Sequence, residues 1–333
     1  MQNHQVASAV RRAYTKDQAL TFDARTLDST GAFLIGELER LEPRLHLPLA
    51  AVTWGRDITL RSDVTMGDEF SSFSNSTFAA AGGIAGSGKA FIGKDASALT
   101  GISVDLGKTA TALTLWGMQI GWTIPELQSA IQLNRPIDAM KFDGMQLKYQ
   151  MDVDEQVYIG DTGLGQFGLA NSPLVTNNTN NLSGLTWAAS TPNQILADVN
   201  ECIRSNWAAT GYSICPEELR VPPAQFALLV SAIVSSAGNI SLLEFLKMNS
   251  LSNSINGKPL NIQPLKWLVG RGAAGKDRMV SYTNDPMRVR FPLVPLQRTP
   301  VEYRDLRQLT TYYGRLGALE VVYPETLSYR DGI

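Results

Sequence analysis

The longest helical pattern in the chain begins after Thr123 and ends near Asp161. Its larger apolar side chains are spaced for one face of a helix, with Gly144 and Asp154 between them. These side chains are Met140, Leu147, Met151 and Tyr158. The pattern predicts a helix over residues 136–157, which would be about 33 Å long at 1.5 Å per residue. No longer rigid element is predicted elsewhere, so the rest of the chain is expected to be organised around this one.

The sequence marks both ends of a shorter helix that precedes the long one. Thr123 and Glu126 have the spacing of a capping box, in which each side chain bonds a free backbone N–H of the first turn. Pro136 separates the two helices, because the residue before a proline is driven out of the helical conformation. Pro136 is therefore a candidate hinge of the long helix.

A long segment rich in glycine and serine separates two strand patterns ahead of these helices. Residues 50–64 predict the start of a strand, and residues 102–123 alternate polar and apolar side chains as a returning strand. A loop as long as residues 65–101 is unusual inside a compact domain. The alternation on its return predicts an extended hairpin that reaches away from the body.

The first 30 residues are polar and rich in small side chains, which predicts an arm without a core of its own. Residues 31–47 contain a short amphipathic helix that ends at Pro43. Its apolar face consists of Phe33, Leu34, Leu38 and Leu41. So short a helix cannot bury this face by itself, and we expect it to pack on the body or on a neighbouring molecule.

The second half of the chain mixes helical and extended patterns. One helix is predicted to start at Pro192 and to end before Gly211, and another follows Ser241 as its N-cap. A strand and a proline-initiated helix lie between them, and short strands follow from about residue 260. Helices beside a sheet, with strands toward both ends of the chain, predict an α+β fold.

Composition and charge exclude several classes of protein. Hydrophobic residues make up 44% of the 333 residues, charged residues make up 18%, and the formal net charge is −2. A chain with this charge is not suited to tight nucleic-acid binding, which requires a basic surface. Cys202 and Cys215 form no disulfide framework and are expected to be reduced. Neither a secretory signal nor a membrane-spanning stretch is recognised, so we expect a soluble protein.

Two glycine-rich segments resemble a phosphate-binding loop, but each lacks a residue that such a loop needs. Residues 83–90 and 270–277 contain Lys89 and Lys276, each followed by a residue without a hydroxyl group. A Ser or Thr is required at that position, because its hydroxyl holds the magnesium ion. A glycine-rich turn with an exposed lysine is the preferred interpretation, and a nucleotide-binding protein is kept as an alternative.

Other signs of an enzyme fail in the same way. The two histidines, His4 and His46, lie near the N-terminus, and the sequence contains no metal-binding or hydrolase motif. We interpret the acidic group Asp152, Asp154 and Glu155 as a solvated helix face or a subunit salt bridge. The sequence thus predicts no enzymatic activity, no cofactor and no metal site. Several long elements that cannot bury themselves indicate self-assembly instead.

Successive segments resemble, in order, the tailed-bacteriophage major capsid protein family, whose Hong Kong 97-type fold is shared with encapsulins. GAFLIGELERLEPRLHLPLAAVTWGRDI resembles the N-arm and the first peripheral strand. Residues 102–123 with IPELQSAIQLNRPIDAMKFDGMQLKYQMD resemble the returning hairpin strand and the spine helix, and VYIGDTGLGQFGLANSP resembles the turn after it. ELRVPPAQFALL, ISLLEFLKMNS and VGRGAAGKDRMVSYTNDP resemble pieces of the axial domain. GALEVVYPETLSYRDGI resembles the closing strands of the peripheral domain.

The resemblance implies a fold with an N-arm, an extended β-hairpin (the E-loop), a spine helix, a peripheral domain and an axial domain. It assigns residues 1–46 to the arm, 56–101 to the hairpin and 191–299 to the axial domain. The peripheral domain would comprise residues 47–55, 102–190 and 300–333, with the spine helix at 136–157. Candidate subunit-interface residues follow from these assignments: Phe33, Leu34, Leu38, Phe70, Phe73, Phe78, Lys89 and Lys94.

The resemblance also implies a function in assembly. The protein would form pentamers and hexamers of an icosahedral head around viral double-stranded DNA, assembled in the host cytoplasm and retained in the virion capsid. Its partners would be a separate scaffolding protein, a portal and a decoration protein, with non-specific DNA contact and no membrane. Some members crosslink a hairpin lysine to a neighbour's asparagine, but no motif marks a partner for Lys89 or Lys94, so crosslinking is not expected. An encapsulin-like compartment for a protein cargo stays open as an alternative.

Overall fold

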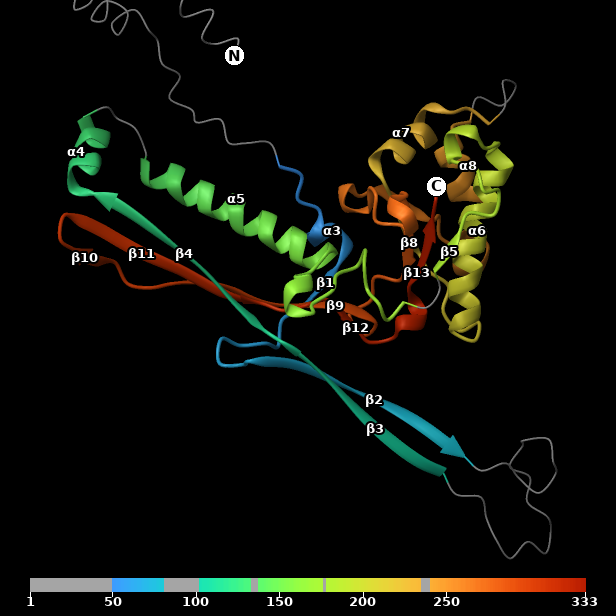
Figure 1. Ribbon diagram of the computed structural model, residues 1–333, viewed down its shortest axis with the longest axis horizontal. Helices are drawn as coiled ribbons and strands as arrows, with labels where there is room; N and C mark the ends of the chain where they lie inside the picture. Colours follow the sequence, from blue (N-terminus) through green and yellow to red (C-terminus); the bar gives the residue numbers. More distant parts are fainter. Residues whose placement is uncertain (1–49, 81–101, 133–136, 176–177, 235–239) are drawn as a thin grey trace, which may run out of the picture. The chain divides into compact units, whose positions relative to one another are not determined.

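The computed structural model describes residues 50–80, 102–132, 137–175, 178–234 and 240–333, all within one compact unit, Leu49–Ile333 (Figure 1). Its helices are α3 (Trp54–Asp57), α4 (Ile124–Gln132), α5 (Ile137–Tyr158), α6 (Pro192–Ala209), α7 (Pro223–Ser231), α8 (Leu242–Asn249) and α9 (Leu251–Asn256). Its 3-10 helices are η1 (Thr162–Leu164), η2 (Trp187–Ala189), η3 (Lys266–Leu268), η4 (Ala273–Gly275) and η5 (Pro324–Thr326). Its strands are β1 (Thr59–Arg61), β2 (Phe70–Ala80), β3 (Ile102–Ala112), β4 (Thr114–Thr123), β5 (Asn178–Asn180), β6 (Glu218–Val221), β7 (Asn261–Pro264), β8 (Arg278–Tyr282), β9 (Val289–Arg298), β10 (Glu302–Arg304), β11 (Arg307–Leu316), β12 (Glu320–Val321) and β13 (Ser328–Asp331).

A six-stranded sheet lies along helix α5. Its order is β1-β9-β11-β10, with β12 paired to β9 and β4 paired to β11. The antiparallel pairing of β4 with β11 runs from Thr114 opposite Leu316 to Thr123 opposite Arg307, so all ten residues of each strand take part. In Figure 1 these two long strands run beside α5, which gives the helix a surface to pack on.

Helix α5 confirms the predicted long helix, shifted by one residue to Ile137–Tyr158, but it buries a different face. Its buried apolar side chains are Met145, Tyr149, Val153, Val157 and Tyr158. Of the predicted stripe only Tyr158 is buried. Met151 is 41% exposed, and Met140 and Leu147 are half-buried.

Aromatic partners on the sheet explain which face of α5 is buried. The ring of Trp116 on β4 meets Tyr149 edge-on at 5.0 Å between centroids. Tyr312 on β11 packs against Phe142 at 5.6 Å. Aromatic pairs at such distances contribute beyond the area that they bury. The strands therefore select the face that carries Tyr149 over the face that carries Met151.

The turn after α5 folds back and satisfies the last carbonyl groups of the helix. The backbone N–H of Leu169 donates to Val157, that of Ala170 to Tyr158 and that of Gly168 to Ile159. These bonds replace the intrahelical partners that the last turn of every helix lacks. The chain approaches so closely that a Cβ at Gly168 would lie 2.2 Å from the Tyr158 carbonyl carbon.

A five-stranded sheet separates two hydrophobic cores. Its order is β5-β13-β8-β6-β7, so the strand nearest the C-terminus lies in its interior. One face joins the core beneath α5, with Val280, Tyr282 and Tyr329 among its members. The other face is covered by α6 to α9 and includes Leu219 and Met279. Alternation along each strand thus sends successive side chains into different cores.

The predicted helix starts before α4, α6 and α8 are confirmed. Thr123 and Glu126 exchange the two bonds of a capping box, at 3.3 and 3.4 Å. Thr191 makes the same arrangement with Gln194 at the start of α6. Ser241 accepts a bond from the Glu244 N–H at the start of α8.

Strands β2 and β3 confirm the predicted hairpin as far as the described residues reach. They pair antiparallel from Phe70 opposite Ala112 to Ala80 opposite Ile102 and form a two-stranded sheet of their own. Residue Leu113 then separates β3 from β4, so one extended stretch of chain passes from the hairpin into the six-stranded sheet. In Figure 1 the hairpin extends away from that sheet.

Candidate functional site

The outer half of the hairpin exposes an apolar face. Ile102, Val104 and Leu106 alternate along β3 on one face, and they are 71%, 52% and 71% exposed. The backbone of Phe78 lies directly opposite Val104 on β2. A two-stranded sheet has no second layer to cover such a face, and contiguous exposed apolar side chains indicate an interaction surface. We name Ile102, Val104 and Leu106 the hairpin patch.

The base of the hairpin, in contrast, packs on the body. Leu113 is buried with Val64 and Val294, and Met66 lies against them. The Leu113 N–H donates to the carbonyl of Glu69, which closes the base at 2.9 Å. The hairpin is therefore fixed at one end and exposed at the other, as a segment that binds another molecule requires.

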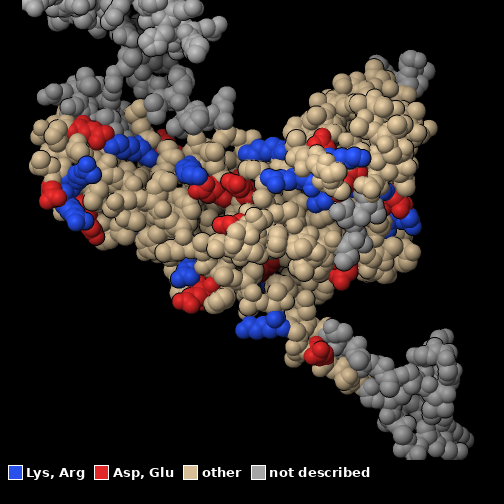
Figure 2. Space-filling view, viewed as in Figure 1, with Lys and Arg blue, Asp and Glu red and all other residues tan. Residues whose placement is uncertain are grey.

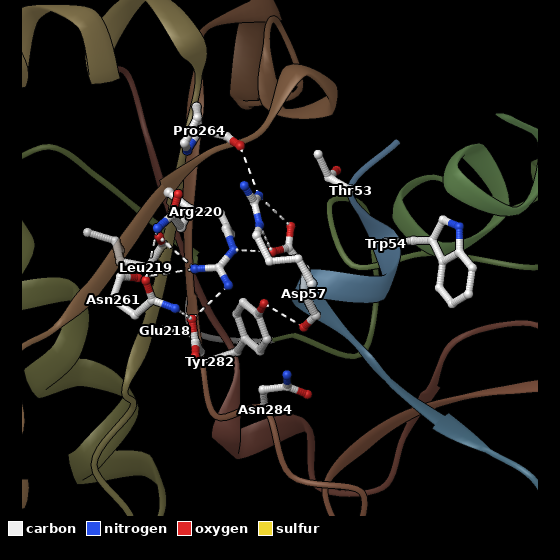
Figure 3. A network of polar contacts seen from close by, with 12 residues as sticks. Thr53, Trp54, Asp57, Glu218, Leu219, Arg220, Asn261, Pro264, Tyr282 and Asn284 are labelled. Carbon is white, nitrogen blue, oxygen red and sulfur yellow. Dashed lines mark hydrogen bonds and ion pairs between the residues drawn. The ribbon is translucent and has the colours of Figure 1, made fainter. Parts of the chain in front are cut away.

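A buried ionic network joins the two halves of the described unit (Figure 3). Figure 3 shows the guanidinium group of Arg220 between the carboxylates of Asp57 and Glu218. Its nitrogens lie 2.9 Å from Asp57 Oδ1 and 2.7 Å from Glu218 Oε2. Asp57 also accepts a 2.6 Å bond from the Tyr158 hydroxyl, and the Tyr282 hydroxyl donates to the Asp57 carbonyl at 2.8 Å.

This network follows from strand alternation. Leu219 and Val221 of β6 enter the core under α6 to α9, so Arg220 must point to the opposite side, toward α3 and α5. Neither Arg220 nor Asp57 has an exposed side chain. A buried charge without a partner is costly, so these contacts fix the sheet against α3.

Asp154 makes a second buried junction, and here the sequence interpretation is wrong. Its side chain is fully buried rather than part of a solvated face. One oxygen accepts the backbone N–H groups of Thr53 and Trp54 at 2.7 and 3.1 Å, and the other accepts Trp267 Nε1 at 2.7 Å. Lys266 Nζ lies 3.2 Å away and balances the charge. Asp154 therefore attaches α5 to α3 and η3.

The second glycine-rich segment does not form a phosphate site. Its backbone N–H groups are occupied within the protein: Gly270 donates to Asp277 Oδ1, Ala273 to Asp331 Oδ2 and Gly272 to the Lys276 carbonyl. The segment leads into strand β8 rather than a helix, so no helix N-terminus faces a ligand. The first segment, with Lys89, lies outside the described residues.

The described part of the chain also offers little support for a metal site or a catalytic thiol. Within residues 50–80, 102–132, 137–175, 178–234 and 240–333, no group of three or more His, Cys, Asp and Glu could hold a metal ion. Cys202 is fully buried between Ser281 and Ser328, and burial raises the pKa of its thiol, which disfavours the reactive thiolate. No helix in these ranges is long and apolar enough to cross a bilayer.

The face drawn in Figure 2 carries charged side chains of both signs. Figure 2 shows uncharged residues over most of the visible face, with basic and acidic side chains interspersed in small groups. Oppositely charged side chains of the described residues also pair locally, such as Lys141 with Glu126 at 2.7 Å. The bond from Lys141 holds the pKa of Glu126 below its usual value. This face therefore offers no basic field of the kind that grips nucleic acid.

Only part of the predicted interface set lies among the described residues. Phe70 is 62% exposed at the start of β2, and Phe73 is half-buried. Phe78 is placed by its backbone alone. The remaining candidates lie outside the described residues: Phe33, Leu34, Leu38, Lys89, Lys94 and the hinge candidate Pro136.

Sequence reasoning missed the hairpin patch and both buried junctions. The period-two spacing of Ile102, Val104 and Leu106 predicts a strand, but along the sequence it does not show that this face of the strand is uncovered. No signal along the chain pairs Arg220 with Asp57, because the contact joins distant segments across two cores.

A family model described as "Major capsid protein" matches residues 88–333. No curated protein matches the chain.

Solved structures share the fold at low sequence identity. The capsid protein of Myoviridae phage XM1 is 16% identical with a TM-score of 0.72, and the match covers 95% of this chain and 100% of that one. The capsid of a native GTA particle is 10% identical with a TM-score of 0.60, covering 89% and 96%. A structure from Microbacterium phage Oxtober96 is 10% identical with a TM-score of 0.58, covering 90% and 98%.

Proposed function

Because the chain belongs to the major capsid protein family, we propose that its hairpin docks on neighbouring copies and thereby joins pentamers and hexamers into an icosahedral head around viral double-stranded DNA. The protein is a structural component of the virion capsid, with the α+β Hong Kong 97-type fold that the sequence predicted. The encapsulin-like alternative is not favoured, because the matching family is that of major capsid proteins. Nucleotide binding at Lys276 is not favoured, because the backbone N–H groups of Gly270, Gly272 and Ala273 already bind within the protein.

The hairpin patch is the observation that carries this proposal. A strand pair that is fixed at its base and apolar at its outer half is stabilised most when that outer half is buried against another molecule. Burial of one such side chain contributes about 1.5–3 kcal/mol. A single contact of this size is weak, but a shell repeats it around every subunit, so the assembled state is far tighter than any pair.

We propose the domain boundaries that the resemblance to the capsid protein family implies. Residues 1–46 form the arm, 56–101 the hairpin and 191–299 the axial domain, with the peripheral domain at 47–55, 102–190 and 300–333. Five of the described strands cross this division: β1 and β9 belong to the six-stranded sheet, β5 and β13 belong to the five-stranded sheet, and β3 pairs with β2 in the hairpin. The two domains are thus proposed as interlocked rather than separable.

We also propose the further partners that the resemblance implies. A scaffolding protein, a portal and a decoration protein complete the head, and packaged DNA touches the shell without sequence preference. Phe33, Leu34 and Leu38 of the arm join the hairpin in contacting neighbours. Lys89 and Lys94 stay uncrosslinked, and Pro136 allows the spine helix to bend in a precursor shell.

The test compares two variants of the hairpin in the full chain. Leu106→Asp places a charge in the patch, and Thr109→Asp places the same charge on the opposite, exposed face. Both should melt within about 2 °C of the parent protein, since neither position is buried. Negative-stain microscopy, with scaffolding protein supplied if required, should show shells for the parent and Thr109→Asp and at least tenfold fewer for Leu106→Asp. Equal shell yields from the two variants would remove the patch from the assembly mechanism.

A further inference from the structure

The carboxylate of Glu320 lies where the hairpin leaves the body. Its side chain has no exposed surface. Arg61 of β1 approaches it at 3.1 Å and Arg290 of β9 at 2.7 Å. The hydroxyl group of Ser71, the second residue of β2, donates to the same carboxylate. One buried group on β12 therefore holds three separate strands.

Arg61 strengthens the link to the hairpin. Its Nη1 also donates to Ser71 Oγ and to the Ser72 carbonyl, both at 3.0 Å. Its other nitrogens bind Asp63 at 2.7 and 3.0 Å, and these bonds hold the pKa of Asp63 below its usual value. The buried charge of Glu320 is thus compensated by two arginines, while Asp63, which is 66% exposed, holds the outer side of Arg61.

Beyond this cluster the outer part of strand β3 is exposed to solvent. On β2, Asn75 Nδ2 donates to the Val322 carbonyl at 3.3 Å. On β3, residues 102–110 are all exposed. Strands rise about 3.3 Å per residue, so the stretch from Ser71 to Ala80 projects about 30 Å. On that length, a rotation of about 10° at the base moves the far end by about 5 Å.

We propose that Glu320 is a positioning residue, which fixes the angle at which the hairpin leaves the six-stranded sheet. It does so by binding the hairpin through Ser71 and the sheet through Arg61 and Arg290. The significance of this angle for shell geometry rests on the proposed function. The angle itself is a property of the single subunit and is measured there.

The experiment measures the angle as a distance. Spin labels on Asp105→Cys in the outer part of β3 and Arg298→Cys at the end of β9 occupy exposed positions on the hairpin and the sheet. The natural Cys202 and Cys215 are buried and free, so they compete little for the label. Pulsed electron resonance on the unassembled full chain then reports the distribution of label separations.

Three variants separate positioning from general stability. Glu320→Gln removes the charge but keeps the size, and Ser71→Ala cuts only the hairpin link. Asp331→Asn is the control, because Asp331 is 1% exposed and binds Arg278 at 2.7 Å in the other sheet. Glu320→Gln and Ser71→Ala should at least double the width of the distance distribution. Asp331→Asn should lower the melting temperature and leave the width unchanged.

A distribution of parental width in Ser71→Ala and in Glu320→Gln would overturn the proposal and leave Glu320 as an ordinary core ion pair. If Glu320→Gln does not fold, the result for Ser71→Ala decides alone. Absence of shells from the parent protein would contradict the proposed function, but it would not change these distances. The proposed role of Glu320 and the proposed function can therefore be disproved independently.

Discussion

Arg220 and Asp57 meet at 2.9 Å with neither side chain exposed, although one lies in the interior of a sheet and the other at the end of a four-residue helix. The pair connects the core beneath α5 with the strand that lines the core of α6 to α9. Tyr158 and Tyr282 complete its hydrogen bonds from two further elements. The two halves of the described unit are thereby fixed to each other by charge as well as by packing.

Loss of one partner should be costly. Arg220→Met leaves the Asp57 carboxylate buried with less compensation, and we expect the free energy of unfolding to fall by about 3–5 kcal/mol. Urea denaturation of the unassembled subunit measures it. The double variant Asp57→Asn/Arg220→Met should recover part of this loss. Arg204→Met is the control, because Arg204 is exposed and its pair with Glu201 is screened by solvent, so its midpoint should stay close to that of the parent.

Two glycines should respond to alanine in opposite directions. At Gly168 a Cβ would overlap the backbone of Tyr158, so Gly168→Ala should destabilise by about 3 kcal/mol or more. Gly144 lies inside α5, and a Cβ added there would have nothing within 4 Å, so Gly144→Ala should stabilise by about 0.5–1 kcal/mol. Thermal unfolding of both variants tests this pair. A neutral Gly168→Ala would mean that the turn can retreat from the helix end.

The Tyr149 hydroxyl is buried without a hydrogen-bond partner among the described residues. Tyr149→Phe should therefore be neutral or stabilise by about 1 kcal/mol at pH 7. Burial raises the pKa of Tyr149 from 10.0 to about 12. This group therefore leaves the free energy of unfolding unchanged below pH 10 and lowers it as the pH rises from 10 to about 12, because the unfolded chain ionises there before the folded one does. The stability of Tyr149→Phe should fall less steeply across that window than that of the parent; parallel curves would contradict the assignment.

Substitution of Asp154 should lower the free energy of unfolding far more than substitution of its neighbour Glu155. Asp154→Asn removes the charge that faces Lys266 and places an amide group against Trp267 or the N–H groups of α3, so we expect a loss of about 2–3 kcal/mol. Glu155→Gln changes an exposed carboxylate one position away and should cost less than about 0.5 kcal/mol. Denaturation followed by tryptophan fluorescence compares the two. Equal losses would show that burial of Asp154 is not what makes it important.

Local patterns along the chain were sufficient for the long helices and the hairpin, but not for residues 50–64, where helix α3 interrupts the predicted strand and β1 keeps only three residues. Capping residues such as Thr123 and Ser241 act within one turn of their own helix, so the sequence displays both partners together. The alternation in β3 predicted the hairpin for the same reason. The resemblance of several ordered segments then supplied the fold, because their order carries more information than any one of them.

Tertiary choices were beyond those patterns. Helix α5 offers two apolar faces, and the Met151 face is as regular as the Tyr149 face. Trp116 on a distant strand decides between them. Asp154 looked solvated for a similar reason, since its partners Thr53 and Trp267 come from remote parts of the chain. Charged residues inside a core are the hardest to anticipate, because their partners rather than their neighbours make burial possible.

The single residue between β3 and β4 has a mechanical consequence. Because Leu113 joins the hairpin directly to β4, a pull on the hairpin travels along the backbone into that strand. Strands β4 and β11 lie along the direction of such a force. Their ten cross-strand residue pairs would therefore share the load in shear instead of opening one after another. A subunit held by its hairpin would thus resist stretching through the longest strand pair of its six-stranded sheet.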